Sequence, residues 1–532
     1  MFRTLLVWCL VLVWCGVSRA EPSVSVKVGW GGLHRVSEWT PVYVTLGGFE
    51  TSSAEGTLEV WAYQDARYTV VHRAPVPLQK RATTFVMPVK MGSLVEAHSV
   101  VVRSGDTGKV LTSVGLGDLP SAEVQNIITA TRLVGISGVW SGGVMPGDFL
   151  GGYVSVERLP EFAELYESLD LLVLTGDTLE RMSLQQASAI AAWVRAGGRL
   201  LVCPPIEGMA APAALMSLFP GAVGPIRMGA VVDLALTASP GAEALQLPGG
   251  FTGVRGRVGF GWVGVLSTPL SVSSRAAAAK LVGEIKPRIA LEPPLVLEEP
   301  VSSRKVAGVA LVVFGLLAGL GEAVVRRAHN VWPWNWSTVA GVGVMFCGGV
   351  VWATAPRDGT AQESMSLVDQ AGGKVVATAR TGAGAEGAAF PRLLVPPGLR
   401  GTDHLTAEVV LEGSAPRLRW LPRSTGVLAG SIGPGPAELV IGVESGAVRL
   451  SAGVDELLLE SERGVQAGRS VGEGKWVFDG SATATLPDAF RLARRLAPLR
   501  SGVLQSRITA GEARVVWTRK GNSFTRTLLD QP

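Results

Sequence analysis

The N-terminal part of the chain alternates between apolar and polar residues with a period of two. Residues 23–28, 41–46 and 56–61 alternate in this way, and two later runs continue the series. Turn residues separate the runs, which is typical of short antiparallel strands. The pattern predicts a β-sandwich over residues 21–122.

Trp30 and Trp39 bracket a glycine-rich turn in this predicted sandwich. Two interpretations are open. The two indole rings could form a ligand platform, or they could fill one end of the sandwich core. We expect the core position, because large aromatic side chains contribute most to stability when they are buried.

From residue 123 the pattern changes to continuous apolar runs separated by an amphipathic stretch. Residues 169–175 and 199–203 are two such runs. Between them, Ser183 and Gln186 have the spacing of a capping box, and a Gly-Gly pair follows the helical stripe. Two apolar strands joined by a helix predict a parallel sheet covered on both faces, in a domain over residues 123–294.

Two long apolar segments follow a linker over residues 295–305. Residues 306–325 and 338–355 are long enough to cross a bilayer, and the segment between them, residues 326–337, is basic and rich in Trp. The pattern predicts a transmembrane hairpin with a cytoplasmic turn. A buried core hairpin is the alternative.

The first 20 residues have the pattern of a secretory signal peptide. Arg3 precedes an apolar stretch over residues 5–17, and Ser18-Arg19-Ala20 matches a small-x-small cleavage site. Export of the N-terminal part and two spans would place both soluble regions on the outer side. We therefore expect a multi-pass protein of a cell inner or plasma membrane, with the lipid bilayer and a membrane or envelope protein as partners.

The last region, residues 356–532, again shows short strands punctuated by Gly and Pro, which predicts a β-rich extracytoplasmic domain, read as a second β-sandwich. One helix is predicted over residues 487–499, with apolar Phe490 and Leu496 and basic Arg491 and Arg494. We expect this helix to pack on the last sheet. The alternative is a position on an anionic lipid surface.

One stretch carries a family resemblance. Residues 169–205 contain Asp-Leu-Leu-Val-Leu-Thr-Gly, Leu-Gln-Gln and then Trp-Val-Arg-Ala-Gly-Gly-Arg-Leu-Leu-Val. This stretch resembles the core of class I glutamine-amidotransferase-like domains, above all the non-catalytic versions in bacterial membrane proteins and in auxiliary components of ABC-type transport systems. The resemblance implies a degenerate amidotransferase-like domain. The predicted fold class is therefore multidomain α+β: an N-terminal β-sandwich, an amidotransferase-like α/β domain with a parallel sheet, a two-helix transmembrane hairpin and a C-terminal β-sandwich.

The resemblance raises the question of a nucleophile, since class I amidotransferases use a Cys–His–Glu triad. Cys203 ends a predicted strand near the expected position. However, Pro204 follows it and has no N–H to offer to an oxyanion, and no histidine occurs between residues 123 and 294. A thiol without a base is a weak nucleophile. We expect an inert, buried Cys203, no catalytic triad and no enzymatic activity.

Ligands of open α/β sheets bind beyond the carboxyl ends of the strands. Thr175 and Asp177 follow the central predicted strand, and Cys203 follows its neighbour, so these three are the candidate ligand-binding residues. For Asp177, the favoured interpretation is that it stabilises the turn before Ser183, and a role in orienting a ligand is the alternative.

Charge and cysteine content argue against several classes of binding partner. The net charge is only +4, which gives no strong electrostatic reason to bind nucleic acid. The four cysteines form no cluster, so we expect neither a bound metal nor another cofactor. The sequence favours a non-enzymatic, membrane-anchored envelope protein whose domains bind or scaffold a partner. The alternatives are an accessory subunit of an ABC-type or other export assembly, and a hydrolase with a non-standard site around Cys203 or Asp177.

Overall fold

The computed structural model describes most of the chain between residues 22 and 530. The described residues are 22–49, 54–64, 68–120, 124–126, 131–138, 149–175, 178–203, 211–228, 232–248, 252–267, 280, 283, 365–372, 374–383, 390–393, 405–412, 415–420, 426–436, 441–444, 447–451, 453–472, 474–478, 480–483 and 485–530. The predicted signal peptide, the linker over 295–305 and the predicted hairpin over 306–355 lie outside them.

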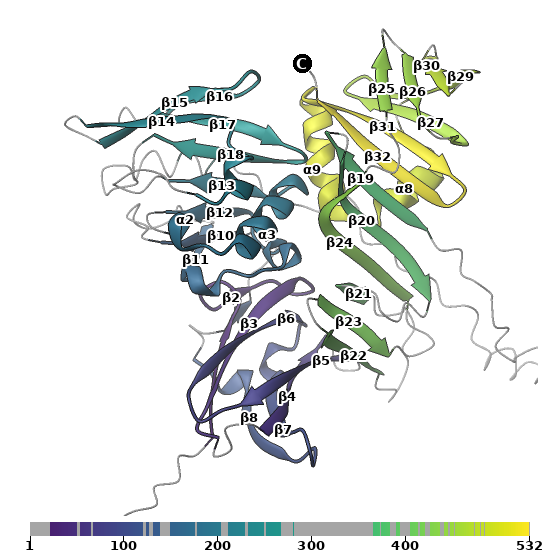
Figure 1. Ribbon diagram of the computed structural model, residues 1–532. Helices are drawn as coiled ribbons and strands as arrows, with labels where there is room; N and C mark the ends of the chain where they lie inside the picture. The colour runs from purple at the N-terminus through teal and green to yellow at the C-terminus, as the bar shows by residue number, and fades with distance from the viewer. Residues whose placement is uncertain are drawn as a thin grey trace, which may run out of the picture.

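The N-terminal region is a sandwich of two sheets, coloured purple and blue in Figure 1. The smaller sheet has the order β1-β3-β6, and the larger has the order β23-β22-β5-β4-β7-β8. Their alternate side chains face inward and form one apolar core. The N-terminal strands of this sandwich are β1 (Ser23–Val28), β3 (Trp39–Gly47), β4 (Ala54–Tyr63), β5 (Tyr68–Leu78), β6 (Thr83–Lys90), β7 (Ser99–Ser104) and β8 (Val110–Gly115). The strands predicted from the period-two pattern are confirmed.

Two strands of the larger sheet come from far along the chain. β22 (Leu405–Glu412) pairs in parallel with β5, and β23 (Ala415–Trp420) pairs with β22 in an antiparallel hairpin. In Figure 1 this green hairpin lies beside the blue strands. A segment that was expected within the C-terminal domain thus extends the N-terminal sheet.

The central region contains a seven-stranded sheet with the order β11-β10-β12-β13-β18-β17-β16. The first five strands in this order are parallel, and the last two continue antiparallel. The strands are β10 (Arg132–Ser137), β11 (Phe149–Tyr153), β12 (Leu171–Leu174), β13 (Arg199–Val202), β16 (Glu243–Gln246), β17 (Thr252–Val258) and β18 (Gly261–Leu266). A separate pair, β14 (Gly221–Met228) and β15 (Val232–Ala238), follows β13, and β2 (Leu33–His34) pairs with β9 (Gln125–Asn126).

The predicted strand–helix–strand unit is present in this sheet. Helix α3 (Leu184–Arg195) connects β12 to β13, and Ser183 and Gln186 form the predicted capping box, with hydrogen bonds of 3.1 and 2.9 Å. Gly197 follows the helix with a φ of 121°, a conformation that glycine adopts without strain. On the other side of the sheet, β11 ends at Tyr153, and a 3₁₀ turn, η3 (Val156–Arg158), begins soon after.

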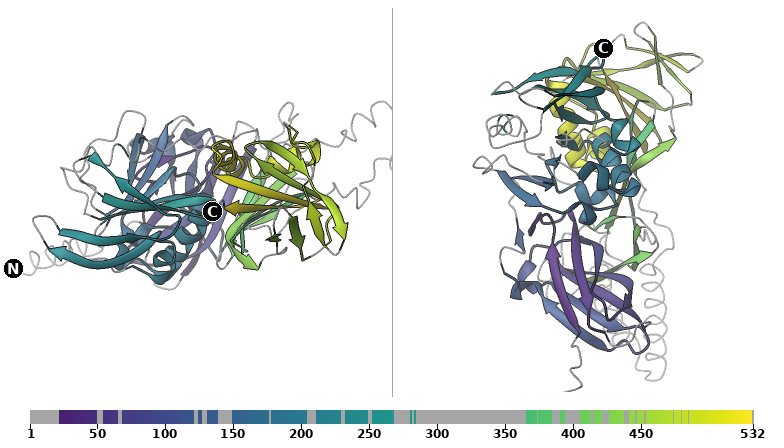
Figure 2. Two further views of the ribbon diagram at one scale, coloured as in Figure 1. Left: turned by 90° about the horizontal axis from the view of Figure 1, so that it is seen from above. Right: turned by 60° about the vertical axis from the view of Figure 1, so that its left-hand side comes forward.

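The C-terminal region is built on an eight-stranded sheet with the order β21-β24-β20-β19-β32-β31-β27-β28, drawn in green and yellow in Figure 2. Helices α8 (Asp488–Arg494) and α9 (Pro498–Thr509) cover it. Phe490 and Leu496 lie in the core beneath them, as the amphipathic pattern predicts, whereas α9 was not predicted. The strands are β19 (Ser366–Ala371), β20 (Lys374–Ala383), β21 (Pro391–Leu393), β24 (Gly426–Pro436), β27 (Glu456–Ser461), β28 (Gly464–Ala467), β31 (Ala513–Lys520) and β32 (Ser523–Asp530). A small sheet flanks it, with β25 (Ile441–Glu444), β26 (Ala447–Leu450), β29 (Arg469–Gly472) and β30 (Lys475–Val477).

The central and C-terminal regions share a packed interface. The β17–β18 turn inserts Phe260 into the C-terminal core, and Arg507 donates a hydrogen bond to the carbonyl of Gly259 at 2.9 Å. Arg257 forms an ion pair with Glu512 at 2.5 Å. Helix α3 contacts both the parallel sheet and β24. The regions are therefore joined by apolar and polar contacts between residues far apart in sequence.

Two expectations need correction. The predicted fold class is wrong, because the described chain is predominantly β, with several sheets and only five α-helices. Besides α3, α8 and α9, these are α2 (Thr178–Arg181) and α4 (Ala213–Met216). The expected multi-pass membrane location is not supported either, because no helix within the described ranges has both the length and the apolar character needed to cross a bilayer.

Candidate functional site

The carboxyl edge of the parallel sheet holds two of the three residues singled out from the sequence. Thr175 follows β12, and its hydroxyl lies 3.3 Å from the carbonyl oxygen of Ser137, to which it donates. Cys203 follows β13, and its amide donates to the carbonyl of Leu174 at 2.9 Å. Asp177 lies outside the described residues. Parallel strands thus bring Thr175 and Cys203 to neighbouring strand ends.

Neither residue is open to solvent. Thr175 is 3% exposed, and Cys203 is 1% exposed and belongs to an apolar cluster that includes Val173 and Leu201. Burial raises the pKa of the Cys203 thiol far above its ordinary value. Because the thiolate is the reactive form, Cys203 is a poor nucleophile in this position.

A pocket lies instead where the N-terminal sandwich meets the parallel sheet. Its volume is about 430 Å³, within the range of small-molecule sites. The lining comes from β1, the glycine turn after it, β3, the end of β11 and η3. The lining residues are Lys27, Gly29, Gly31, Gly32, Tyr43, Tyr153, Val154, Ser155 and Arg158. This combination of residues was not predicted from the sequence.

The glycine turn of the pocket is anchored by Trp30. The indole is fully buried, its Nε1 donates to the hydroxyl of Ser168 at 3.1 Å, and its ring lies 5.3 Å from that of Tyr166. The prediction that Trp30 is buried in a core is confirmed, but the core belongs to the central region. Gly31 has a φ of 60°, and a Cβ there would lie 2.8 Å from the amide nitrogen of Tyr153. A larger residue would therefore not fit at Gly31 without a shift of the turn.

Tyr43 joins the sandwich to η3 across the pocket. Its hydroxyl donates to the carbonyl of Arg158 at 2.7 Å, and the guanidinium of Arg158 lies 5.9 Å from the centre of the Tyr43 ring. Burial raises the pKa of Tyr43, so the hydroxyl stays protonated as a donor. The Arg158 backbone and side chain are thus both in contact with β3.

The pocket carries an excess of positive charge. Lys27 is exposed and Arg158 is half-buried, and no acidic residue occurs among the described residues that line the pocket. Glu157, the neighbour of Arg158, forms an ion pair with Arg181 instead. No carboxylate of the described chain forms an ion pair with Lys27 or Arg158. An anionic ligand would meet no charge repulsion from the lining.

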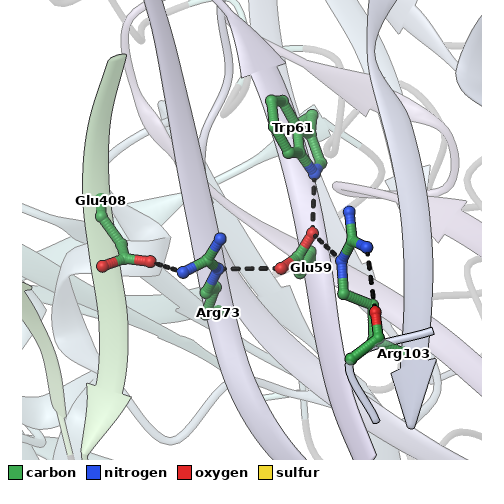
Figure 3. Close-up of polar contacts among 6 residues, drawn as sticks. Glu59, Trp61, Arg73, Arg103 and Glu408 are labelled. Carbon is green, nitrogen blue, oxygen red and sulfur yellow. Dashed lines mark hydrogen bonds and ion pairs between the residues drawn. The ribbon is translucent and has the colours of Figure 1, made fainter. Parts of the chain in front are cut away.

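A second polar cluster lies on the larger sheet of the sandwich (Figure 3). Glu59 is 2% exposed, and its carboxylate forms an ion pair with Arg73 at 2.9 Å and accepts hydrogen bonds from Arg103 at 3.0 Å and from the indole of Trp61 at 3.0 Å. Arg73 also pairs with Glu408 of β22. Glu408, Arg73, Glu59 and Arg103 thus form a row of alternating charges, with one residue from each of β22, β5, β4 and β7. Each charge has a partner of opposite sign, so we interpret this row as a structural link between the four strands.

Three buried histidines lie in the same sandwich, and burial lowers the pKa of each. The pKa falls to about 4 for His34 and His98 and to about 3 for His72, and proximity to His98 lowers the values of His34 and His72 further. His72 accepts from the amide of Lys90, and His98 accepts from the amide of Gly92. No group of three or more potential ligands in the described chain has the arrangement of a metal site. The three imidazoles are therefore neutral core residues at pH 7.

Comparison with known proteins gives one match. The family model "Domain of unknown function (DUF8726)" matches residues 21–115, which form most of the N-terminal sandwich. No curated protein and no solved structure has significant similarity to the chain. The match covers a limited part of the chain and names no activity.

The sequence contained a partial signal for the pocket. The run Gly29-Trp30-Gly31-Gly32 predicts a glycine-rich turn beside a possible ligand platform. Tyr153 and Arg158 come more than 120 residues later and reach the turn only through the packing of β11 and η3 against it. Because that packing is a tertiary contact, the local pattern could not reveal the complete site.

Proposed function

We propose that this protein is a non-enzymatic binding protein, which holds a ligand or partner at the junction between its N-terminal sandwich and its central sheet. The pocket beside the glycine turn carries the proposal, because two regions contribute to it and Tyr153, at its edge, is 54% exposed. Exposed aromatic side chains with an apolar body and a polar tip are frequent in binding surfaces.

We also infer that the central region is a degenerate amidotransferase-like domain. Support comes from the parallel β12–α3–β13 unit in the stretch that carries the resemblance. Cys203 is buried and its pKa is raised, which fits a domain that has the amidotransferase-like fold but no amidotransferase activity.

The binding role can be tested with the full-length tagged protein. After crosslinking in cells and gentle purification, mass spectrometry would identify both crosslinked proteins and bound small molecules. We expect a ligand or partner near one equivalent with the wild type, and loss of it in Tyr153→Ser. Leu184→Ser is the matched control, since Leu184 is 72% exposed on α3 and does not line the pocket.

The outcomes separate the hypotheses. A preparation without any ligand or partner in all three proteins would contradict the binding role, and so would equal capture by wild type and Tyr153→Ser. A transporter ATPase captured in a Tyr153-dependent manner would identify the protein as an accessory subunit of an export assembly.

A further inference from the structure

Two positively charged residues of the pocket lining favour the binding of an anion. Lys27 and Arg158 approach the pocket from two different elements, β1 and η3, and no carboxylate occurs among the lining residues that the structure describes. Two cations attract an anion into a concave site more strongly than they would on a flat surface, because the walls focus the field.

Arg158 is positioned before any ligand arrives. Its amide donates to the carbonyl of Ser155 at 2.9 Å, its carbonyl accepts from Tyr43 at 2.7 Å, and its guanidinium carbon lies over the Tyr43 ring, 5.9 Å from the ring centre. A planar guanidinium offers paired N–H groups that match the two oxygens of a carboxylate or phosphate. Holding it in place lowers the entropy that binding would cost.

The remaining lining favours a ligand that also has an apolar part. Tyr153, whose side chain is 54% exposed, lines the pocket together with Val154 and Tyr43, so aromatic and aliphatic residues are part of the lining. Ser155 adds a neutral polar residue beside the cations. An inorganic ion has no apolar group that could pack against the aromatic residues of the lining.

We propose that this pocket binds a small organic oxyanion, a carboxylate or phosphate ester that bears a ring or short apolar chain. The oxygens contact Arg158 and Lys27, and the apolar part packs against Tyr153. This inference rests on the proposed binding role and specifies the ligand class at the same site.

The test is a calorimetric titration of the full-length protein with four probes: phenyl phosphate, benzoate, inorganic phosphate and uncharged benzamide. We expect one of the two aromatic anions to bind more tightly than inorganic phosphate, and benzamide to show no binding. The better of phenyl phosphate and benzoate identifies the head group. Affinity should fall as KCl is added, since salt screens the two cations.

Variants connect the binding to the pocket. Lys27→Gln and Arg158→Gln should each weaken the binding of the better anion by about tenfold or more, as expected for the loss of a charge-assisted hydrogen bond. Lys109→Gln and Arg81→Gln remove the same charges at exposed turns outside the pocket and should leave the affinity unchanged. Lys27 is exposed, so Lys27→Gln decides the question even if Arg158→Gln fails to fold.

Three results would overturn the inference: no binding of either aromatic anion at millimolar concentration, equal binding of benzamide, or full affinity in Lys27→Gln. If the Tyr153→Ser variant still loses a captured partner while no anion binds, the proposed binding role stands and the oxyanion inference alone fails. If capture and anion binding both fail, the pocket has no role as a binding site.

Discussion

The carboxylate of Glu408 pairs with the guanidinium of Arg73, which lies 335 residues earlier in the chain (Figure 3). The same guanidinium contacts the buried Glu59, so the late strand β22 is connected by one arginine to the centre of the N-terminal sheet. Without β22, β5 would be an edge strand with unpaired backbone groups. The C-terminal half of the chain thus protects an edge of the N-terminal sandwich.

The two carboxylates of this row should differ in their effect on stability. Glu408→Ala removes an ion pair whose side chains are 21% and 39% exposed, and we expect a loss of about 0–1 kcal/mol in the free energy of unfolding. Glu59→Ala removes a buried carboxylate that accepts hydrogen bonds from Trp61 and Arg103 and pairs with Arg73, and it should cost about 1–3 kcal/mol. Urea denaturation of the purified variants measures both values.

Glu55→Ala is the control for Glu59→Ala, since Glu55 lies on the same strand with an exposed side chain. A cost for Glu55→Ala equal to that for Glu59→Ala would contradict the assigned role of the row. A double-mutant cycle of Arg73→Ala and Glu408→Ala measures the coupling between the two strands directly.

Asp369 forms the most deeply buried ion pair described in the C-terminal sheet. Its two oxygens accept from Arg526 and Arg500 at 2.8 Å each, and desolvation by burial opposes these two cations, which together lower its pKa. Asp369→Asn should destabilise the fold by about 3–5 kcal/mol, because the buried Arg526 would lose the counter-charge of Asp369 and Arg500 would keep only its pair with Glu167 at 3.8 Å. Thermal and urea unfolding check the loss.

The pH dependence follows from the lowered pKa of Asp369. The stabilisation that the Asp369 carboxylate gives to the folded chain is present above the ordinary carboxyl pKa of about 3.9. It is lost as the pH falls below that value, because the carboxylate is then protonated.

Asp488→Asn is the control for Asp369→Asn, since Asp488 is 89% exposed on α8. The loss in the free energy of unfolding for Asp488→Asn should stay within about 0.5 kcal/mol. If Asp369→Asn and Asp488→Asn unfold at the same urea concentration, the buried ion pairs of Asp369 do not contribute strongly to the stability of the fold.

Local patterns predicted the elements of this protein better than their arrangement. The period-two alternation over 23–28 matches β1 residue for residue, and the capping box at Ser183 begins α3, because both features depend on neighbours in sequence. The placement of β22 beside β5 could not be predicted, since an edge strand with alternating residues fits several sheets equally well.

The same limit applies to the candidate site. Thr175 and Cys203 follow the neighbouring parallel strands β12 and β13, and the strand–helix–strand pattern that places them there can be recognised in the sequence. Their burial depends on residues that pack over the edge from elsewhere. The cations of the pocket, Lys27 and Arg158, come from different regions, and only the tertiary fold brings them to one cavity.

The buried histidines predict a loss of stability in mild acid. His34, His72 and His98 have folded pKa values of about 4, 3 and 4, below the ordinary value of about 6.5. As the pH falls through 6.5, the unfolded chain takes up protons that the folded chain excludes. The free energy of unfolding should therefore decrease between about pH 6.5 and pH 4. Urea titrations at pH 7, 6, 5 and 4.5, followed by tryptophan fluorescence, measure the decrease.

A single substitution isolates one histidine of this group. Both ring nitrogens of His34 are buried without a hydrogen-bond partner among the described residues, so His34→Leu should change stability at pH 7 by less than about 1.5 kcal/mol. The same variant should show a shallower decrease toward pH 4.5. A decrease as steep as in the wild type would show that His34 does not contribute to the acid sensitivity.

Cys203 distinguishes a binding protein from a hydrolase with an unusual site. The thiol is buried against Val173 and Leu201 and its pKa is raised, so iodoacetamide should leave it unmodified in the folded protein and alkylate it after unfolding in urea. Peptide mass spectrometry follows this residue separately from the other cysteines.

Cys203→Ala should leave ligand capture and probe binding unchanged, with a loss of stability of about 1 kcal/mol from the removed sulfur. Rapid alkylation of the folded protein at pH 7, together with loss of a measured hydrolytic activity in Cys203→Ala, would instead assign this thiol a catalytic role.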